Sequence, residues 1–311
     1  MDMSLNRVAF TSDDIKAFIN KPISGPLEHG EGDALPRISV VVPSFNQGRF
    51  LERTILSIIN QNYPNTELIV IDGGSTDETL SVIKKYEDII AYWVSEPDNG
   101  QSEALNKGLF AATGEIFAWQ NSDDIYLPGA FASVSRVFME HPQISVCYGN
   151  WISIDENDNI TDIHYALRPR YPHAPFENMD VYNQAMFWRC SCCKACGGFD
   201  ESLHSLMDTD FMIRTMQALG PEGYHKVEVF LGAFRWYSEQ KTDFLKMTDQ
   251  QQAEERYIEE KYHFLPKDSM KGKYYRTRYR LAQLFESLRY GGFSYTGKKF
   301  KQTYRRRGKF I

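Results

Sequence analysis

The sequence has few cysteines, and they are not spaced as in a disulfide framework. There are five Cys in 311 residues, and four of them lie between Cys190 and Cys196. An odd number of closely spaced thiols does not build a disulfide-stapled secreted domain. The pair Cys193 and Cys196 has no second Cys-x-x-Cys pair downstream, which disfavours a zinc site. We therefore expect buried or incidental thiols and a reducing compartment.

Long apolar runs are also missing. No stretch approaches the ~18 apolar residues that a membrane-spanning helix needs. The first ten residues, MDMSLNRVAF, lack the basic-then-apolar pattern of a secretory signal. These absences predict a cytoplasmic protein, whose contact with the inner face of a membrane, if it has one, is peripheral.

Charge is distributed unevenly over an otherwise ordinary globular composition of 42% hydrophobic residues. The net charge is −6, yet residues 267–311 hold 14 Lys/Arg and 2 Asp/Glu, which leaves 21 basic and 39 acidic residues elsewhere. Apolar residues at helical spacing, from Leu281 to Leu288, make this segment a predicted basic amphipathic helix. Two interpretations stay open: contact with an anionic membrane surface, or packing against the acidic body with a solvated cationic face. Nucleic-acid binding is not expected.

Apolar strands alternate with amphipathic helices through the first half of the chain. Strands are predicted at 38–42, 67–71, 89–94, 116–119 and 144–148, with helices at 12–19, 49–60, 77–86, 101–112 and 129–140. This alternation predicts a parallel sheet with helices on both faces. A hairpin starting at Trp151 with a turn at 156–159, a helix over 208–219, a strand over 229–236 and helices beyond 243 make the expected sheet mixed.

Polar loops follow each of the first four predicted strands, at 43–46, 72–77, 96–101 and 120–124. Such residues also suit ordinary turns. Four in succession on one sheet edge indicate a ligand, because ligands of α/β sheets bind beyond the carboxyl ends of strands. Asp72 and Asp98 can accept hydrogen bonds from a base or ribose. Asp123 and Asp124 would repel a diphosphate unless Mn²⁺ or Mg²⁺ lay between them, and no Gly-Lys-Ser/Thr phosphate loop is present as an alternative.

Four of these segments, 38–46, 67–77, 95–101 and 121–124, resemble family 2 glycosyltransferases. The stretch Gly197–Glu201, followed by Met207–Phe211, resembles the family's acceptor side. The resemblance implies an α/β GT-A fold, that is, a Rossmann-like mixed sheet with helices on both faces. It further implies an N-terminal extension and linker over 1–36, a glycosyltransferase domain over 37–242 and a basic helical C-terminal extension over 243–311.

The resemblance also implies roles for individual residues. Asp208 matches the catalytic base, although by pattern alone it could equally be a first-turn acid of the helix that follows. Asp123 and Asp124 match the metal site. The expected nucleotide-binding residues are Pro43, Ser44, Asn46, Asp72, Asp98, Asn121 and Ser122. The expected donor or acceptor pocket contains Gln101, Gln184, Trp188, Asp210, Arg235 and Tyr237.

Two positions depart from the family pattern. Asn121 stands where Asp is commoner, and Tyr237 stands where relatives often have His. An amide adds no charge, and a phenol with a pKa near 10 is a poor metal ligand at neutral pH. Arg235 and Lys241 remain to neutralise a diphosphate. Gly232 occupies a position where processive synthases carry Gln, which disfavours a processive polymerase.

The function that these patterns predict is inverting, metal-dependent sugar transfer. The donor is expected to be a nucleotide-sugar, most simply a UDP-sugar, and the acceptor a saccharide or lipid-linked hydroxyl in surface polysaccharide or glycolipid assembly. One alternative is a sugar-nucleotide-forming nucleotidyltransferase, although the stretch 43–49 lacks that class's Gly-rich loop with Arg and Lys. The other is a degenerate, non-catalytic nucleotide-sugar-binding protein.

Overall fold

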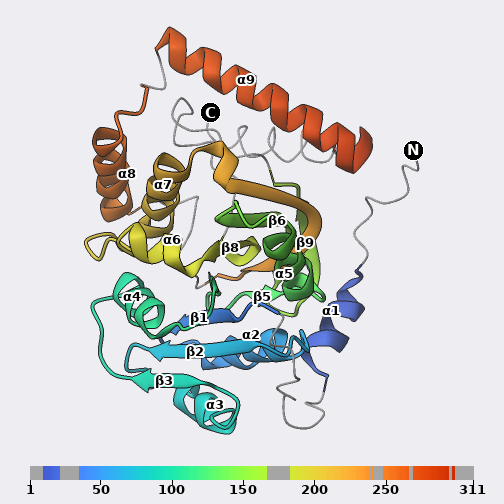
Figure 1. Ribbon diagram of the computed structural model, residues 1–311, viewed down its shortest axis with the longest axis vertical. Helices are drawn as coiled ribbons and strands as arrows, with labels where there is room; N and C mark the ends of the chain where they lie inside the picture. The colour runs from blue at the N-terminus through green and yellow to red at the C-terminus, as the bar shows by residue number, and fades with distance from the viewer. Residues whose placement is uncertain are drawn as a thin grey trace.

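The structure, a computed structural model, describes residues 10–21, 35–166, 183–238, 240, 248–265, 269–293 and 296–297. Most of the expected N-terminal linker, Lys241, the expected boundary at 242/243 and the last 14 residues of the basic tail lie outside this range. Within it, nine strands form one mixed sheet with helices on both faces (Figure 1), as the sequence predicted.

The strand order is β3-β2-β1-β4-β8-β6-β9-β5, with β7 paired to β6. The strands are Ile38–Ser44 (β1), Thr66–Asp72 (β2), Tyr92–Ser95 (β3), Ile116–Trp119 (β4), Ile125–Tyr126 (β5), Val146–Asp155 (β6), Ile160–His164 (β7), Met186–Arg189 (β8) and Tyr224–Trp236 (β9). The α-helices are Ser12–Ile19 (α1), Gly48–Ile59 (α2), Thr79–Lys85 (α3), Gln101–Ala111 (α4), Ala130–Glu140 (α5), Cys190–Ala195 (α6), Met207–Leu219 (α7), Asp249–Lys261 (α8) and Met270–Glu286 (α9).

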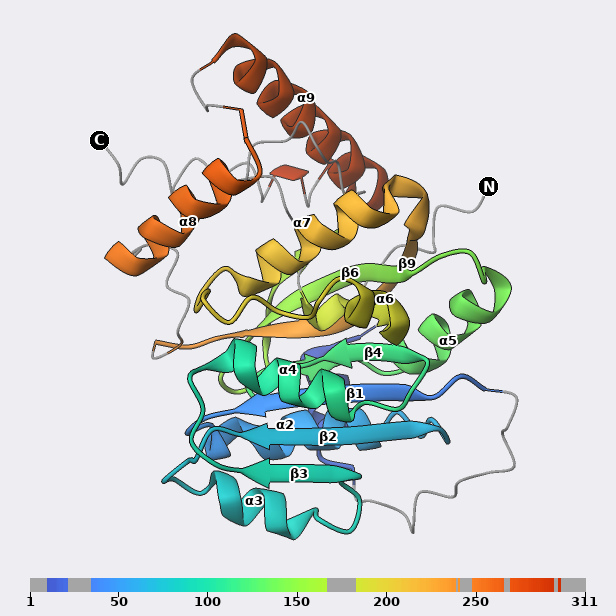
Figure 2. The same cartoon turned by 60° about the vertical axis from the view of Figure 1, so that its left-hand side comes forward.

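The parallel half of the sheet comprises β3, β2, β1 and β4. Its strands read as continuous apolar runs because both faces are covered. Val40 and Val42 of β1 join the core under α2, α3 and α5, whereas Val41 joins the core under α4, α6 and α7. Figure 2 shows α4, α6 and α7 together on one side of the sheet. Because these strands are parallel, their carboxyl ends and the polar loops that follow lie at one edge.

The other half of the sheet is where the structure differs from the sequence-based expectation. The strand expected to end at Tyr148 continues as β6 to Asp155, with a register shift around Gly149. A Cβ at Gly149 would lie 2.8 Å from the Leu231 side chain, so only glycine lets β9 approach there. β8 joins β4 to β6 by antiparallel pairing on both sides. Neither β8, α6 nor β5 was anticipated, because each is too short to show a period.

The membrane-spanning potential of the helices and the state of the cysteines are the two features expected from what the sequence lacks. No helix in the described ranges is long and apolar enough to cross a membrane. The five thiols are all free, and two of the four in the cluster are buried. Among the residues that the structure covers, no group of three or more His, Cys, Asp or Glu side chains could hold a metal ion.

Candidate active site

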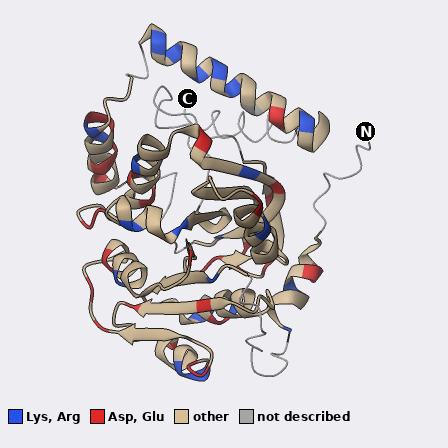
Figure 3. Cartoon of the chain, viewed as in Figure 1, with Lys and Arg blue, Asp and Glu red and all other residues tan. Residues whose placement is uncertain are grey.

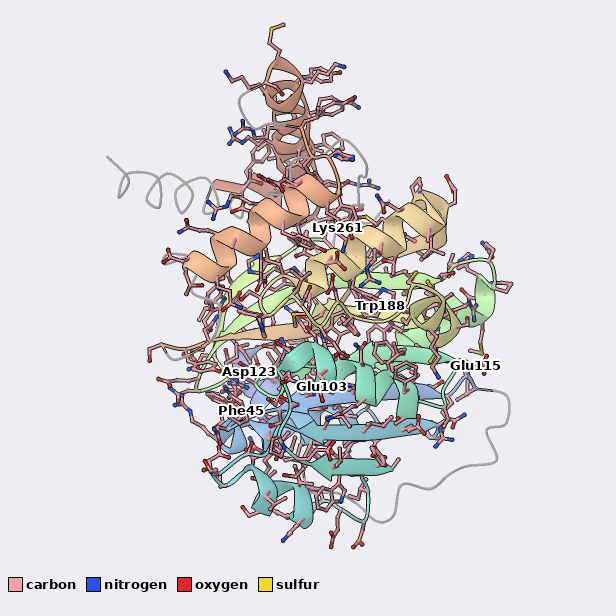
Figure 4. All side chains as sticks on the ribbon, turned by 90° about the vertical axis from the view of Figure 1, so that its left-hand side faces the viewer. Phe45, Glu103, Glu115, Asp123, Trp188 and Lys261 are labelled. Atoms are coloured by element: carbon pink, nitrogen blue, oxygen red, sulfur yellow. The ribbon has the colours of Figure 1, made fainter. Side chains whose placement is uncertain are left out.

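The loops that follow β1 and β2 are joined at the carboxyl edge of the sheet. Figure 4 shows Phe45 and Asp123 near this edge, with Glu115 at the opposite edge. Asn46 adopts a left-handed backbone conformation (φ 52°), which its short polar side chain tolerates. Its N–H donates to Ser75 Oγ at 2.7 Å, and its Oδ1 accepts from the Thr76 N–H at 2.9 Å. These contacts make the two loops one surface, bordered by the buried Ser44 at the end of β1.

Asp72 is buried at the end of β2. Its carboxylate accepts hydrogen bonds from the Ser75 N–H at 3.0 Å, the Ser75 hydroxyl, and the Ser95 hydroxyl at 2.6 Å. Both oxygens therefore hold the loop after β2, and Oδ2 also ties the end of β2 to the end of β3. The contact with a nucleotide base that the sequence suggested for Asp72 stays a prediction.

Asp98 lies against Gly73, where a Cβ would stand 2.9 Å from the Asp98 carboxylate. Gly73 thus leaves space for this side chain at the centre of the edge. Asp98 accepts a hydrogen bond from the Gly100 N–H at 2.9 Å. Burial raises the pKa of Asp98, and the nearby carboxylate of Glu103 adds to the shift. A ligand that donates a hydrogen bond here would relieve this unfavourable desolvation.

Asp123, in the loop after β4, shares its carboxylate with Tyr237. The Tyr237 hydroxyl donates to Asp123 Oδ2 at 2.8 Å and accepts a hydrogen bond from Gln47 Nε2 at 3.1 Å. Burial raises the pKa of Asp123 against the opposing effect of the Tyr237 bond. Burial and the neighbouring Asp123 charge likewise raise the pKa of Tyr237, so the phenol stays protonated. The residue that replaces the expected His therefore contacts the acidic loop as a hydrogen-bond donor.

Asp124 faces the interior, and its expected role as a metal ligand stays a prediction. The side chain is buried, and its Oδ1 accepts from the Arg235 N–H at 2.8 Å. Its Oδ2 accepts from Asn121 Nδ2 at 3.2 Å. Burial, followed by repulsion from Asp123, raises the pKa of Asp124 well above its usual value. The side chain holds the loop to β9 and does not face the edge.

Asn121 connects the acidic loop to α4. Its Oδ1 accepts from Gln101 Nε2 at 2.8 Å, while its Nδ2 donates to Asp124. An aspartate could not make the second bond while ionised, so the amide matches its two neighbours. The carbonyl of the buried Ser122 accepts from the Thr54 hydroxyl at 2.9 Å. Gln101, Asn121 and Ser122 therefore fix the loop's shape from both sides.

Arg235 is fully buried, and its expected place in the donor or acceptor pocket stays a prediction. Its Nε donates to the Asp123 carbonyl at 2.7 Å, and its guanidinium pairs with Asp158 at 2.7 Å. The guanidinium also lies over the Phe50 ring, 4.8 Å from the centroid. This cation supports the backbone beneath Asp123 and is not exposed to neutralise a diphosphate.

Asp208 lies in the first turn of α7, half-buried, with its carboxylate near the Thr209 N–H and hydroxyl. The loop before α7 is bound to the start of α4. Ser102 Oγ donates to the Leu203 carbonyl at 2.7 Å, and the His204 ring lies 3.3 Å from where a Cβ of Gly100 would be. These contacts bring the acceptor-side segment next to the Asp98 loop.

The same loop is held from behind by α8. The buried Glu254 carboxylate accepts hydrogen bonds from three successive N–H groups, those of His204, Ser205 and Leu206, at 2.9–3.0 Å. Asp210 is anchored as well: it accepts from Arg214 Nε at 2.7 Å, Lys261 Nζ at 2.8 Å and the Tyr262 hydroxyl at 2.6 Å. Three protein donors thus occupy the Asp210 carboxylate, and its expected place in a substrate pocket stays a prediction. Asp208 lies two residues earlier in α7, so it starts from a different face of the helix.

Three further polar side chains are buried around β4 and β8. Gln120, Gln184 and the Trp188 indole N–H are fully buried and have no hydrogen-bond partner among the described residues. Trp188 stacks on Trp119 with ring centroids 4.6 Å apart, so its ring is part of the core. The Gln184 carbonyl lies where a Cβ of Gly232 would be, so glycine is needed for β9 to pass. Buried amides without partners are costly, and a polar ligand would satisfy them.

Sequence reasoning missed several of these residues. Phe45 is 60% exposed at the edge, although nothing in the run Pro43–Asn46 distinguishes an exposed ring from a buried one. Gln120 belongs to the polar loop at 120–124, but no feature of the sequence distinguishes it from its neighbours there. Glu254 lies in a helix of many charges, and only its distant partners reveal its role. The one available signal was the placement of Phe45 and Gln120 in loops already assigned to the ligand.

A divalent cation fits this edge only in part. With Asp124 turned inward, Asp123 is the one carboxylate of the acidic loop near the edge, and Tyr237 already donates to one of its oxygens. Mg²⁺ and Mn²⁺ commonly take one or two carboxylates and complete their coordination with substrate phosphates and water. The residues present therefore fit a cation that arrives with a phosphorylated ligand.

Comparison with known sequences identifies the family. The family described as Glycosyl transferase family 2 matches residues 39–197. An uncharacterised glycosyltransferase of Nostoc sp. is 32% identical over 129 residues, which cover 40% of this chain and 40% of that protein. One from Mycobacterium tuberculosis is 30% identical over 195 residues, covering 60% of this chain and 71% of the relative. The chain thus matches less than half the length of the Nostoc relative.

Solved structures are similar in fold. TarS from S. aureus in complex with UDP-GlcNAc has a TM-score of 0.59 at 18% identity, covering 83% of this chain and 73% of that one. The mannosyltransferase PcManGT from Pyrobaculum calidifontis, in complex with GDP-Man and Mn²⁺, has a TM-score of 0.51 at 16% identity, covering 90% and 79%. The mixed sheet with its polar carboxyl edge is a GT-A fold. The chain belongs to glycosyl transferase family 2.

Proposed function

We propose that the protein transfers a sugar from a nucleotide-sugar, a UDP-sugar in the simplest case, to an acceptor hydroxyl with inversion at the anomeric carbon. The support for this proposal is the position of two acids, one in the loop after β4 and the other in the first turn of α7. Asp123 stands at the end of β4, held by Tyr237 and Arg235, and Asp208 stands at the start of α7, which α4 and α8 hold against the same edge.

Asp208 is the proposed base. Its carboxylate takes the proton of the acceptor hydroxyl, whose oxygen bonds to the anomeric carbon while the bond to the diphosphate oxygen breaks. A divalent cation held through Asp123, Mn²⁺ or Mg²⁺, would supply positive charge that stabilises the departing diphosphate. Asp123 then orients the donor, and the buried Arg235 keeps Asp123 in place from below.

The donor's other parts have candidate contacts. The exposed Phe45 ring offers an apolar face on which a base can stack. Ser44 and Asn46 flank Phe45 in the chain, and Asp98 suits a ribose or base that donates a hydrogen bond. Gln120 and Gln184 are buried amides that can hydrogen-bond to sugar hydroxyls. The Trp188 ring is part of the core, so its face is not available to a sugar. UDP-GlcNAc in TarS and GDP-Man in PcManGT are donors of the same chemical class.

The decisive variant is Asp208→Asn. Removing a general base typically costs on the order of 10²–10⁴ in rate, while the amide keeps the shape of the side chain. We expect transfer to fall by that factor and UDP binding, measured by calorimetry, to stay unchanged. The exposed first-turn residue of α8 provides a matched control, and Asp249→Asn should alter neither quantity. Full activity of Asp208→Asn would disprove the assignment.

The acceptor we propose is a saccharide or lipid-linked saccharide in surface polysaccharide or glycolipid assembly, met at the inner face of a membrane. We also keep the proposed division into an extension over 1–36, a catalytic domain over 37–242 and a basic extension over 243–311. A nucleotidyltransferase would instead release pyrophosphate from a nucleoside triphosphate and a sugar phosphate, which separates that class. Slow release of UDP from UDP-sugars with Mn²⁺ argues against a non-catalytic binding protein.

A further inference from the structure

Helix α9 lies at the end of the molecule opposite α3, as Figures 1 and 2 both show. One of its faces is turned toward the protein, with Gly272 and Tyr279 buried. The π-helical turn that follows is tied to β9, because the Tyr290 hydroxyl donates to Glu228 Oε1 at 2.8 Å and the Lys226 ammonium lies 4.5 Å from the Tyr290 ring centroid. The opposite face of α9 therefore points away from the sheet.

That outward face is apolar. Met270 is 89% exposed, Tyr274 57%, Leu281 59% and Phe285 66%. At 3.6 residues per turn, these four positions fall within an arc of about 60° and form one stripe along the helix. The stripe inverts the usual arrangement, in which a surface helix turns its large apolar residues toward the core.

Cations border the stripe on both sides. Lys273 and Arg280 lie along one border and Lys271 and Arg278 along the other, and all four side chains are exposed. The Arg278 guanidinium lies 5.7 Å from the Tyr274 ring centroid, at the junction of stripe and border. Within α9 the one acidic residue is Glu286, at its end. Figure 3 shows basic residues along the length of the helix.

This arrangement decides between the interpretations that the sequence left open. A helix that merely packed on the acidic body would bury its apolar residues and expose its cations alone. Here the apolar stripe itself is exposed, with cations at its borders, which is the pattern of a helix lying in a membrane interface. A second copy of the chain would bring two strongly basic helices together. A nucleic acid would contact the cations but would not require the exposed apolar stripe.

We propose that the outward face of α9 docks on an anionic lipid bilayer, with its axis in the plane of the membrane. Leu281 and Phe285 enter the boundary between head groups and acyl chains, while the four bordering cations contact lipid phosphates. The inference deepens the proposed function, since it would hold the catalytic edge near a lipid-linked acceptor. Lipid docking itself does not depend on catalysis, so the two can fail separately.

The test is co-sedimentation of the full chain with phosphatidylcholine vesicles, with and without phosphatidylglycerol. We expect binding to the anionic vesicles that weakens with salt. Lys273→Gln with Arg280→Gln should weaken binding roughly 30-fold, because each cation contributes about a factor of five. Leu281→Ser with Phe285→Ser should weaken it by at least about tenfold. The charge-matched control, Lys84→Gln with Arg136→Gln, changes exposed cations away from α9 and should bind as the parent does.

Transfer to a soluble acceptor is measured on the same proteins and should be equal in all of them. Lost vesicle binding with unchanged transfer in both α9 variants supports the inference. Unchanged binding in those variants, or equal loss in the control, overturns it. Failure of the parent to bind anionic vesicles also overturns it, as does a dimer in solution that Leu281→Ser with Phe285→Ser converts to a monomer. Vesicle binding without any sugar transfer would uphold the inference and reject the proposed function.

Discussion

Tyr237 is the residue that most distinguishes this edge from the pattern the chain resembles. Its hydroxyl donates to Asp123 while Gln47 donates to it, and its ring lies 4.9 Å from the Phe50 ring centroid. Any cation bound through Asp123 has to share that carboxylate with the phenol. This competition predicts that Asp123 contributes less to metal binding here than it would if residue 237 were a histidine.

Tyr237→Phe tests this competition. The variant removes one hydrogen bond, so we expect a loss of about 1 kcal/mol in the free energy of unfolding. The Mn²⁺ concentration for half-maximal transfer should fall by about fivefold, since the same free energy no longer opposes coordination. Tyr290→Phe removes a comparable hydroxyl beside α9 and should not change the Mn²⁺ titration. A higher Mn²⁺ requirement in Tyr237→Phe would mean that the phenol orients Asp123 for the metal.

Glu67, at the amino end of the parallel strands, makes stability depend on pH. Burial alone would raise its pKa, but hydrogen bonds from Ser39 and Thr113 and the Arg37 charge lower it below the usual 4.5. A carboxylate whose pKa is lower in the folded state stabilises the fold above its unfolded pKa, and the gain is lost as pH falls. This residue therefore stabilises the native state at neutral pH.

Glu67→Gln should lower the free energy of unfolding by about 1–2 kcal/mol near neutral pH. The difference from the parent should shrink as pH falls through and below about 4.5, because the parent side chain is then protonated. Urea unfolding at both pH values measures the effect. Glu115→Gln, an exposed change at the same edge, should cost less than about 0.5 kcal/mol at either pH. A penalty for Glu67→Gln that does not vary with pH would contradict the assignment.

Among the elements, α8 does more than extend the chain. Its Glu254 carboxylate accepts three backbone N–H groups just before α7, and its end supplies Lys261 to Asp210. A carboxylate bound to successive N–H groups acts as an anion at a helix N-terminus does. The position of Asp208, two residues further on, therefore depends on a helix some 50 residues downstream.

Glu254→Gln should cost about 1–3 kcal/mol in the free energy of unfolding, because a neutral amide holds the three donors less well. We expect kcat to fall by about tenfold while KM for the donor changes little, because the loop lies on the acceptor side. Glu260→Gln, exposed on the same helix, should change neither. Equal losses in kcat and in donor affinity would show that Glu254 acts on the whole fold and not on the Asp208 loop.

At the scale of the whole molecule, the edge draws on both halves of the sheet. β1 to β4 provide the loops with Phe45, Asp98 and Asp123, and β9 provides Arg235 and Tyr237. A ligand bound at this edge would contact both halves and bind the folded state alone. Such binding raises the stability of the entire protein.

UDP at about 100 times its Kd should therefore raise stability by about 2.7 kcal/mol. We expect the rise in Tm to be largest with Mn²⁺ present and to fall when EDTA removes the metal. GDP and dTDP in the same thermal-shift series measure base preference. In Asp123→Asn, the additional rise in Tm caused by Mn²⁺ should disappear, whereas part of the rise in Tm caused by UDP should remain. An increment equal with and without Mn²⁺ in the parent would reject the metal-dependent mechanism.

The sequence by itself determined the fold class and the edge where the site lies. Alternating apolar strands and amphipathic helices require parallel βαβ units, and parallel strands bring successive polar loops to one edge. That physics needs only local periodicity, so the positions of Asp72, Asp98 and Asp123 at strand ends followed from the chain alone. The family motifs, which are local too, indicated glycosyl transferase family 2.

The contacts that hold each polar side chain follow from the tertiary structure. Asp123 and Asp124 are adjacent and chemically alike, yet the second is turned inward by the Arg235 N–H, 111 residues away. Asp210 is likewise held by distant partners, because Lys261 at the end of α8 and Tyr262 just after it bind its carboxylate. The direction of a side chain depends on partners distant in sequence, whose approach no local pattern encodes. The outward stripe of α9 is the same case, since periodicity shows that a helix has an apolar face but not which side the protein covers.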